Sequence, residues 1–250
     1  VCVWASNQKL LGCQQFSIEK QGGENMREEC DWRCDRENYV SARDHAAVVQ
    51  RQFEEEEKLG AMLQLDLAEA QARFGEQLAV ASLGAIEKKN GTFRVVHDGT
   101  HGVGINPGIK IRDQLKSPCA GDIKAVMQEL PGCYFDLTGD VARAHRLVKV
   151  AEVDWGLMAC KTGTSSRIWV NRVGSFGISS AAYHWSRLMS GVGRAVYYAL
   201  GKSELFLLVY VDDLLWMVRE AKGLELIVMS IFYLEVLGLP FAWKKFKGGI

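Results

Sequence analysis

Residues 205–218 read Leu-Phe-Leu-Leu-Val-Tyr-Val-Asp-Asp-Leu-Leu-Trp-Met-Val, two apolar runs separated by the adjacent acids Asp212 and Asp213. The runs predict two buried strands that face each other across the acid pair as a hairpin. Two like charges are costly to bury side by side, because they repel each other strongly in a low dielectric. The pair is therefore either an exposed turn, for which Asp is well suited, or a site that binds something positive.

The segments around this hairpin predict a mixed sheet. Residues 133–138 form an apolar strand, and residues 179–200 form a long amphipathic helix that opens with two serines. A second helix over 221–237 stops at Gly238, and residues 241–246 return as a strand. The order of strand, helix, hairpin, helix and strand is that of a split βαβ sheet with helices on one face. The predicted fold class is α+β.

Charge and composition divide the chain into two parts. The whole chain is neutral, but residues 1–70 contain 8 Lys+Arg and 14 Asp+Glu, a net charge of −6, which leaves +6 on the other 180 residues. Residues 1–45 lack periodicity, and 46–81 are strong helix formers. We therefore expect an acidic segment over 1–84, disordered and then helical, followed by a domain over 85–250 that is suited to phosphates.

The cysteines and the apolar stretches limit the class of protein. The seven cysteines are odd in number and form no CxxC pair: Cys2, Cys13, Cys30, Cys34, Cys119, Cys133 and Cys160. Free thiols of this kind favour an intracellular, reducing compartment. The longest apolar stretches, 205–218 and 224–239, are interrupted by acids, so neither is a membrane span. The first residue is Val1 rather than Met, which favours a fragment.

The tetrapeptide Tyr-Val-Asp-Asp at 210–213 resembles the catalytic hairpin of reverse transcriptases. Four other segments resemble further motifs of that family and occur in its order. They are Asn-Gly-Thr-Phe-Arg-Val-Val-His-Asp at 90–98, Phe-Asp-Leu-Thr-Gly-Asp-Val-Ala-Arg-Ala-His at 135–145, Phe-Gly-Ile-Ser-Ser-Ala-Ala at 176–182, with Trp185 and Arg187 beyond it, and the lysine segment at 238–245. Each motif alone is weak, but five in one order make a strong signal. The resemblance covers residues 85–247.

The resemblance implies the palm and part of the fingers of an RNA-directed DNA polymerase of retroelement type. Such a nucleotidyltransferase adds deoxynucleoside triphosphates to a primer 3′-hydroxyl on an RNA or DNA template. It implies Asp140, Asp212 and Asp213 as the catalytic carboxylates, and Val141 as their neighbour in the metal site. Two Mg²⁺ ions, with Mn²⁺ as a substitute, would be held by these hard oxygen ligands. Asp136 competes with Asp140 for the role in the first palm motif.

The same resemblance implies a set of nucleotide-binding residues: Lys89, Arg94, His145, Phe176, Gly177 and Lys245. Arg94 and Lys89 would neutralise the triphosphate, or else belong to a solvated strand edge. His145 would be a partial gate beside the sugar, or would only pack on the palm. Lys245 would act as an acid towards pyrophosphate, with Lys244 as the alternative. Gly177 would let the backbone approach the nucleotide, or would be a plain turn glycine.

The sequence departs from the family's pattern at three places. Ala182 stands where the family often has proline, and His145 stands where it has Tyr or Phe. The chain ends at Ile250, so we expect the primer-grip hairpin, the thumb and the RNase H and integrase parts to be absent from this truncated fragment. An alternative function is a catalytically silent polymerase fold that binds RNA or a protein. The intact acids favour the polymerase, and the oligomeric state stays open.

Overall fold

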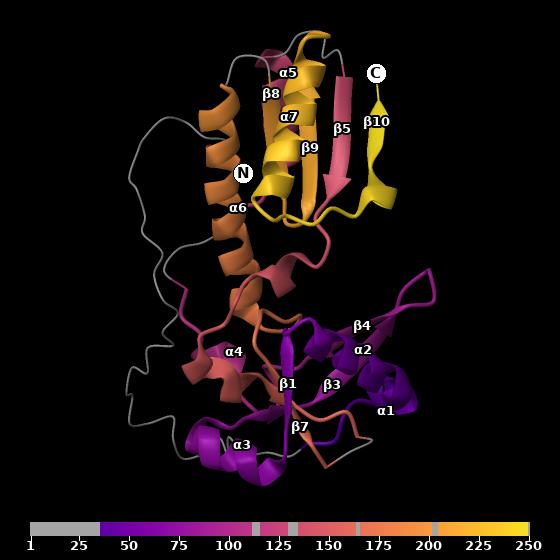
Figure 1. Ribbon diagram of the computed structural model, residues 1–250, viewed down its shortest axis with the longest axis vertical. Coiled ribbons are helices and arrows are strands. Elements are labelled where there is room, and N and C mark those ends of the chain that lie inside the picture. Colours follow the sequence, from indigo (N-terminus) through magenta and orange to yellow (C-terminus); the bar gives the residue numbers. More distant parts are fainter. Residues whose placement is uncertain (1–35, 112–115, 130–134, 164–165, 202–204, 250) are drawn as a thin grey trace. The chain divides into compact units, whose positions relative to one another are not determined.

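The computed structural model describes residues 36–111, 116–129, 135–163, 166–201 and 205–249, which divide into two compact units (Figure 1). Unit 1 contains the described residues 116–129, 135–144, 182–201 and 205–249. Unit 2 contains 36–111, 145–163 and 166–181. The predicted boundary between residues 84 and 85 falls inside a strand of unit 2.

Unit 1 is built on a four-stranded antiparallel sheet in the order β10-β5-β9-β8. Its strands are β5 (Phe135–Asp140), β8 (Leu205–Tyr210), β9 (Asp213–Val218) and β10 (Lys247–Gly249). Its helices are α5 (Ala120–Glu129), α7 (Gly223–Val236), the short 3-10 helix η4 (Trp243–Lys245) and most of α6 (Ser179–Leu200). The predicted α+β class and the order of strand, helix, hairpin, helix and strand are confirmed.

The alternation of side chains along β8 and β9 explains how unit 1 forms its core. Leu205, Leu207, Leu214, Trp216 and Val218 project to one face and are all buried. Helix α7 packs against β8 and β9 (Figure 1), and a Cβ on its first residue, Gly223, would lie 2.5 Å from the Val218 side chain. On the other face, Val126 of α5 clusters with Leu208 and Met217, so the expectation of helices on one face alone is wrong. A helix packs there because this second face of the hairpin is also apolar.

Unit 2 contains a four-stranded sheet and a separate hairpin. The sheet has the order β1-β7-β6-β2, with β1 (Met62–Leu65), β7 (Ile168–Asn171), β6 (Ala159–Cys160) and β2 (Val80–Ala81). The hairpin pairs β3 (Leu83–Glu87) with β4 (Phe93–His97). The α-helices are α1 (Val40–Asp44), α2 (Ala46–Lys58), α3 (Leu67–Phe74) and α4 (Ile105–Gly108), and the 3-10 helices are η1 (Gly75–Gln77), η2 (Ala144–Leu147), which starts at the boundary of unit 1, and η3 (Glu152–Met158).

The structure corrects the expected helices over 46–81, because strands β1 and β2 interrupt them. Met62 and Leu65 are buried where β1 pairs with β7, so this pairing overrides the helix propensity of Met and Leu. The acidic segment is also part of a core, since Val49 and Phe53 of α2 pack with Leu83 of β3. The expectation of loop or disorder over residues 1–45 is wrong at residues 40–44, which form helix α1, because Ala42 is buried in the same core. Residues 1–35 lie outside the described part of the chain.

Other expected elements are matched or shifted. Helix α6 has the predicted bounds, and α7 begins and ends within two residues of them. The strand predicted over 241–246 is wrong, because residues 243–245 form a 3-10 helix and the strand follows at 247–249. The first two residues of the strand predicted over 133–138 lie outside the described residues.

Two of the seven cysteines lie among the described residues. Cys119 is exposed and Cys160 is buried, and both are free thiols. The other five cysteines lie outside the described residues. None of the helices in the described ranges is long and apolar enough to cross a membrane.

Candidate active site

The sheet of unit 1 aligns the predicted catalytic acids. Strands β5 and β9 pair antiparallel, and their register places Asp140 directly opposite Asp213. The same residue of β9 pairs with Tyr210, the last residue of β8, so Val211 and Asp212 alone form the turn of the hairpin. The three acids therefore meet at one end of the sheet, on two strands and the turn beside them.

The turn that carries Asp212 is strained and held in place from two sides. Val211 has a φ of 55°, which is unfavourable for a β-branched residue. The Trp185 indole N–H donates to the Val211 carbonyl at 2.6 Å, and the Val141 N–H donates to the Asp212 carbonyl at 2.8 Å. Trp185 is fully buried in α6, so it is a rigid donor. These bonds fix the backbone from which the Asp212 carboxylate projects.

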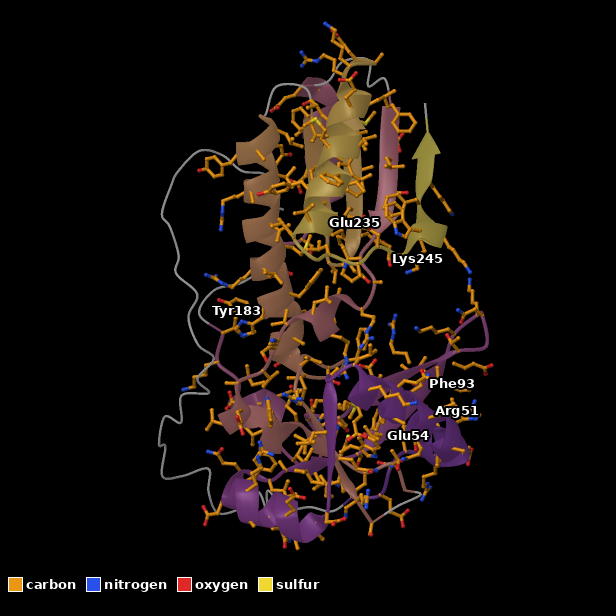
Figure 2. All side chains as sticks on the ribbon, in the orientation of Figure 1. Arg51, Glu54, Phe93, Tyr183, Glu235 and Lys245 are labelled. Carbon is orange, nitrogen blue, oxygen red and sulfur yellow. The ribbon has the colours of Figure 1, made fainter. Side chains whose placement is uncertain are left out.

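Lys245 reaches the same end of the sheet (Figure 2). The Ala242 N–H donates to the carbonyl of Asp140 at 2.9 Å, and the short helix η4 follows directly. The Lys245 ammonium then bonds the Asp140 carboxylate, with 2.6 Å between Nζ and Oδ2. Sequence reasoning left Lys244 and Lys245 as alternatives, and the structure places Lys245 in contact with an acid.

The charges in this group influence one another. Burial, followed by the charges of Asp212 and Asp140, raises the pKa of the Asp213 carboxyl. The hydrogen bond to Asp140, together with the charges of the three acids, raises the pKa of the Lys245 ammonium despite its partial burial. Lys245 is therefore protonated at neutral pH and partly offsets three clustered negative charges.

The register also separates Asp140 from its competitor Asp136. Asp136 pairs with Met217 of β9 and with Gly249 of β10, four residues along β5 from Asp140. At about 3.3 Å per residue, the two acids are about 13 Å apart along the strand. Asp140 is the acid of β5 that lies beside the hairpin turn.

The chemistry of the acids suits a hard divalent cation, because carboxylate oxygens are the ligands that Mg²⁺ prefers. Within the described ranges, no three Asp, Glu, His or Cys side chains are grouped closely enough to hold a metal ion as they stand. The Lys245 ammonium bonds one oxygen of Asp140. Asp140, Asp212 and Asp213 are the residues whose oxygens would hold such a cation, and the Val141 N–H is bonded to the Asp212 carbonyl beside them.

The nucleotide-binding candidates other than Lys245 belong to unit 2, and two of them, Arg94 and His145, contact the ring of a third, Phe176. The Arg94 guanidinium lies 4.8 Å from the centre of the Phe176 ring, a cation–π contact. His145 meets the same ring edge-on, with 5.3 Å between the ring centres. Arg94 is exposed in β4, so its charge remains available to a ligand. Lys89 is also exposed, in the turn between β3 and β4.

Gly177 follows Phe176 in the chain, and the local backbone explains why this residue is glycine. Its φ is +98°, and a Cβ would lie only 1.9 Å from the carbonyl oxygen of His97. The need for glycine therefore arises from packing against β4, whether or not a nucleotide approaches. The predicted site residues fall into two groups. The three acids and Lys245 belong to unit 1, and the Phe176 group, which is Lys89, Arg94, His145, Phe176 and Gly177, belongs to unit 2.

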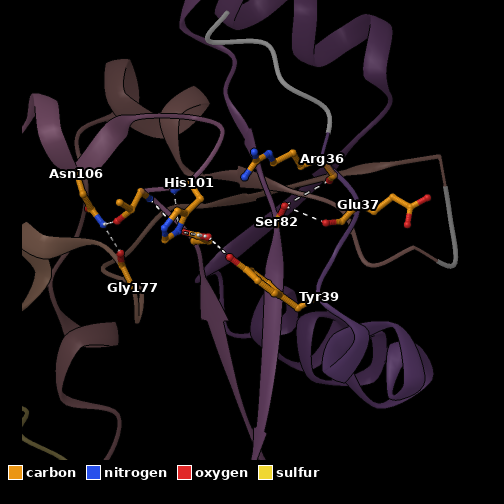
Figure 3. Close-up of polar contacts among 9 residues, drawn as sticks. Arg36, Glu37, Tyr39, Ser82, His101, Asn106 and Gly177 are labelled. Carbon is orange, nitrogen blue, oxygen red and sulfur yellow. Dashed lines mark hydrogen bonds and ion pairs between the residues drawn. The ribbon is translucent and has the colours of Figure 1, made fainter. Parts of the chain in front are cut away.

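Sequence reasoning missed a polar network on the loop after β4 (Figure 3). The Asp98 carboxylate accepts from the backbone N–H groups of Thr100 at 2.9 Å and His101 at 3.0 Å, and from the Tyr39 hydroxyl. Burial alone would favour the protonated acid, but these hydrogen bonds lower the pKa of Asp98 to about 2. Asn106 of α4 belongs to the same network, and the Asn-Pro pair after a glycine-rich loop was its only sequence signal.

Solved structures identify the fold. No family model matches this chain, and no curated protein matches it in sequence. The native protease-reverse transcriptase of prototype foamy virus superimposes with a TM-score of 0.60 at 13% identity, covering 84% of this chain and 24% of that one. The fold is reverse-transcriptase-like.

A second foamy viral protease-reverse transcriptase, solved in complex with double-stranded DNA, gives a TM-score of 0.57 at 12% identity. This match covers 78% of the present chain and 30% of the viral one. The chain therefore spans less than a third of the length of these reverse transcriptases. At such low identity the likeness concerns the fold alone.

Proposed function

We propose that this chain is the fingers and palm region of an RNA-directed DNA polymerase of retroelement type. The observation that carries the proposal is the strand register that places Asp140 opposite Asp213, beside a turn that fixes Asp212, within a reverse-transcriptase-like fold. Three acids gathered at one end of a sheet repel one another and so are costly for stability, and a function that needs them is the simplest reason for their presence.

Each member of the acid group has a role in this proposal. Asp140, Asp212 and Asp213 would hold two Mg²⁺ ions, or Mn²⁺ in their place, with the backbone of Val141 beside them. When bound, the ions would lower the pKa of the primer 3′-hydroxyl and stabilise charge on pyrophosphate. Lys245 is protonated and lies against Asp140, and it would give a proton to the leaving group once its bond to Asp140, which raises its pKa, is broken.

The Phe176 group would bind the nucleotide. Arg94 would grip the triphosphate with its planar guanidinium, which rests on the Phe176 ring, and Lys89 would add a point charge. His145 would lie beside the sugar, and Gly177 beside the base pair. The template would be RNA or DNA carrying a primer, and the DNA complex of a foamy viral enzyme with this fold supports nucleic acid as the partner.

Primer extension with Mg²⁺ or Mn²⁺ on an RNA template tests the proposal. Asp212→Asn should reduce kcat at least about 100-fold, which is about 3 kcal/mol of transition-state stabilisation. Its thermal stability should be equal or higher, since one of two repelling charges is removed. Asp136→Asn is the matched control, because it changes an acid of β5 remote from the turn. Parental activity in Asp212→Asn would reject the assignment.

The alternative is a silent polymerase fold that binds RNA or a protein. One observation favours it, namely the bond from Lys245 to Asp140, which occupies an oxygen that a metal would need. The two functions differ in a simple way. A silent fold would bind RNA in a fluorescence-anisotropy titration without extending a primer in either metal, and Lys245→Met would not create extension.

A further inference from the structure

The side chain of Asn106 joins two segments of unit 2, the loop after β4 and residues 177–179, and Figure 3 shows its contact with Gly177. Its Nδ2 group donates to the Thr100 hydroxyl and to the Gly177 carbonyl, both at 2.8 Å. Its Oδ1 accepts from the Ser179 N–H at 2.9 Å. An amide side chain has two donor hydrogens and one acceptor oxygen, so each part of this amide is in use.

The bond to Ser179 replaces a local helix cap. Ser179 is the first residue of α6, and the first N–H groups of a helix have no partner within it. A residue at the N-cap position usually supplies the acceptor. Here Asn106, 73 residues earlier, supplies one. The same side chain therefore fixes the Gly177 carbonyl and the start of the helix that follows it.

The two segments that Asn106 joins approach each other very closely. A Cβ on Gly99 would lie 2.7 Å from the Ile178 side chain and 3.1 Å from Asn106 Oδ1. The His97 N–H donates to the Phe176 carbonyl at 2.8 Å, which holds the same segment at its other end. Residues 176–179 are thus held against the loop after β4 by backbone and side-chain bonds together.

The loop that carries Asn106 is itself well anchored. Asp98 accepts the backbone N–H groups of Thr100 and His101, and the Asn106 N–H donates to the Gly99 carbonyl at 2.7 Å. A side chain whose backbone is itself held by hydrogen bonds keeps its own partners in place more firmly than a side chain on a mobile loop. Asn106 can therefore transmit the geometry of this loop to Phe176 and Gly177.

We propose that Asn106 is a positioning residue for nucleotide binding, which sets where Phe176 lies beneath Arg94 and beside His145. This inference rests on the proposed polymerase function and adds a residue to its nucleotide site. Asn106 belongs to α4 of unit 2, whereas the three acids belong to the sheet of unit 1, and its hydrogen bonds go to Thr100, Gly177 and Ser179. Its loss should therefore weaken nucleotide binding and leave the chemical step largely intact.

Three variants separate positioning from simple stabilisation. Asn106→Asp keeps an acceptor for Ser179 but cannot donate to Gly177, so the helix cap survives and the Gly177 bond is lost. Asn106→Ala removes both. Thr100→Val removes one partner of Asn106 and leaves Gly177 and Ser179 bonded, which makes it the matched control.

Steady-state primer extension at varied deoxynucleotide concentration gives the decisive measurement. Asn106→Asp should raise KM for the nucleotide about tenfold, change kcat less than about threefold and keep the parental melting temperature. Thr100→Val should keep the parental KM. A merely structural role predicts that KM changes only in step with the melting temperature, so a stable Asn106→Asp protein with parental KM would overturn the proposal.

Amide hydrogen exchange distinguishes a failure of this inference from a failure of the proposed function. Asn106→Ala should speed exchange of the Ser179 amide about tenfold or more, and Thr100→Val should not. Unchanged exchange in Asn106→Ala would refute the positioning contact even in an active enzyme. A parent chain that extends no primer would instead refute the polymerase function, and with it the nucleotide role, while the exchange result still decides whether Asn106 holds the segment.

Discussion

His97 gives a stability prediction whose size follows from the structure. Its side chain in β4 is fully buried, and neither ring nitrogen has a hydrogen-bond partner among the described residues. Burial lowers the pKa of His97 to about 4, although the nearby charge of Asp98 acts in the opposite direction. The imidazole is therefore neutral at pH 7, and protonating it requires a buried, unpaired charge.

The free energy follows from the two pKa values. In the unfolded chain His97 becomes protonated as the pH falls below its ordinary pKa of 6.5. In the folded protein it stays neutral until the pH falls to about 4. Stability is therefore lost as the pH falls through this window, because the unfolded state binds more protons. At about 1.4 kcal/mol per pKa unit, the loss is about 3 kcal/mol. That is a large part of the stability of a typical domain.

Urea unfolding at pH 7 and pH 4.5 measures this effect in His97→Leu and His97→Gln. Both variants lack the titrating group, so the fall in unfolding free energy between the two pH values should be smaller by about 2 kcal/mol or more. His184→Asn should show a similar reduction, because burial and then the charge of Arg187 lower the pKa of His184 to about 4 as well. The reasoning would be refuted if both His97 variants lost as much stability as the parent.

Two further predictions concern the Phe176 group. Gly177→Ala should lower the melting temperature far more than Gly60→Ala, since both glycines have positive φ but only at Gly177 would the new methyl clash with the His97 carbonyl. No atom lies within 4 Å of a Cβ added at Gly60, so Gly60→Ala should lose only the roughly 1–2 kcal/mol of stability that a left-handed backbone costs an alanine. His145→Ala should admit ribonucleotides about tenfold better relative to deoxynucleotides, and His145→Phe should sharpen the selection, as measured by the ratio of kcat/KM values.

The sequence predicts those elements whose signal is local. Helix α6 carries an amphipathic pattern over 22 residues and starts at a serine pair, so its bounds follow from the chain alone. Strand β1 carries no such signal. Met62 to Leu65 are good helix formers, and only their pairing with β7, about 100 residues later, makes them a strand. Contacts between distant segments decide what local propensity leaves open.

The same division applies to the candidate site. The adjacent acids Asp212 and Asp213 are visible in the sequence because charged residues interrupt an apolar run. The choice of Asp140 over Asp136 depends on strand register, which a spacing of four residues does not reveal. The role of Asn106 is hidden for a similar reason, since its partners Gly177 and Ser179 lie more than 70 residues away.

The hairpin turn departs from the local preference of its sequence. Valine at a positive φ costs of order 1–3 kcal/mol, and a glycine or asparagine at this position would avoid most of that cost. The chain instead keeps Val211 and stabilises the turn with bonds from Trp185 and Val141. Those bonds do not remove the strain. They fix the backbone of Asp212 beside Asp140 and Asp213, so the position from which this carboxylate projects is set by the fold itself.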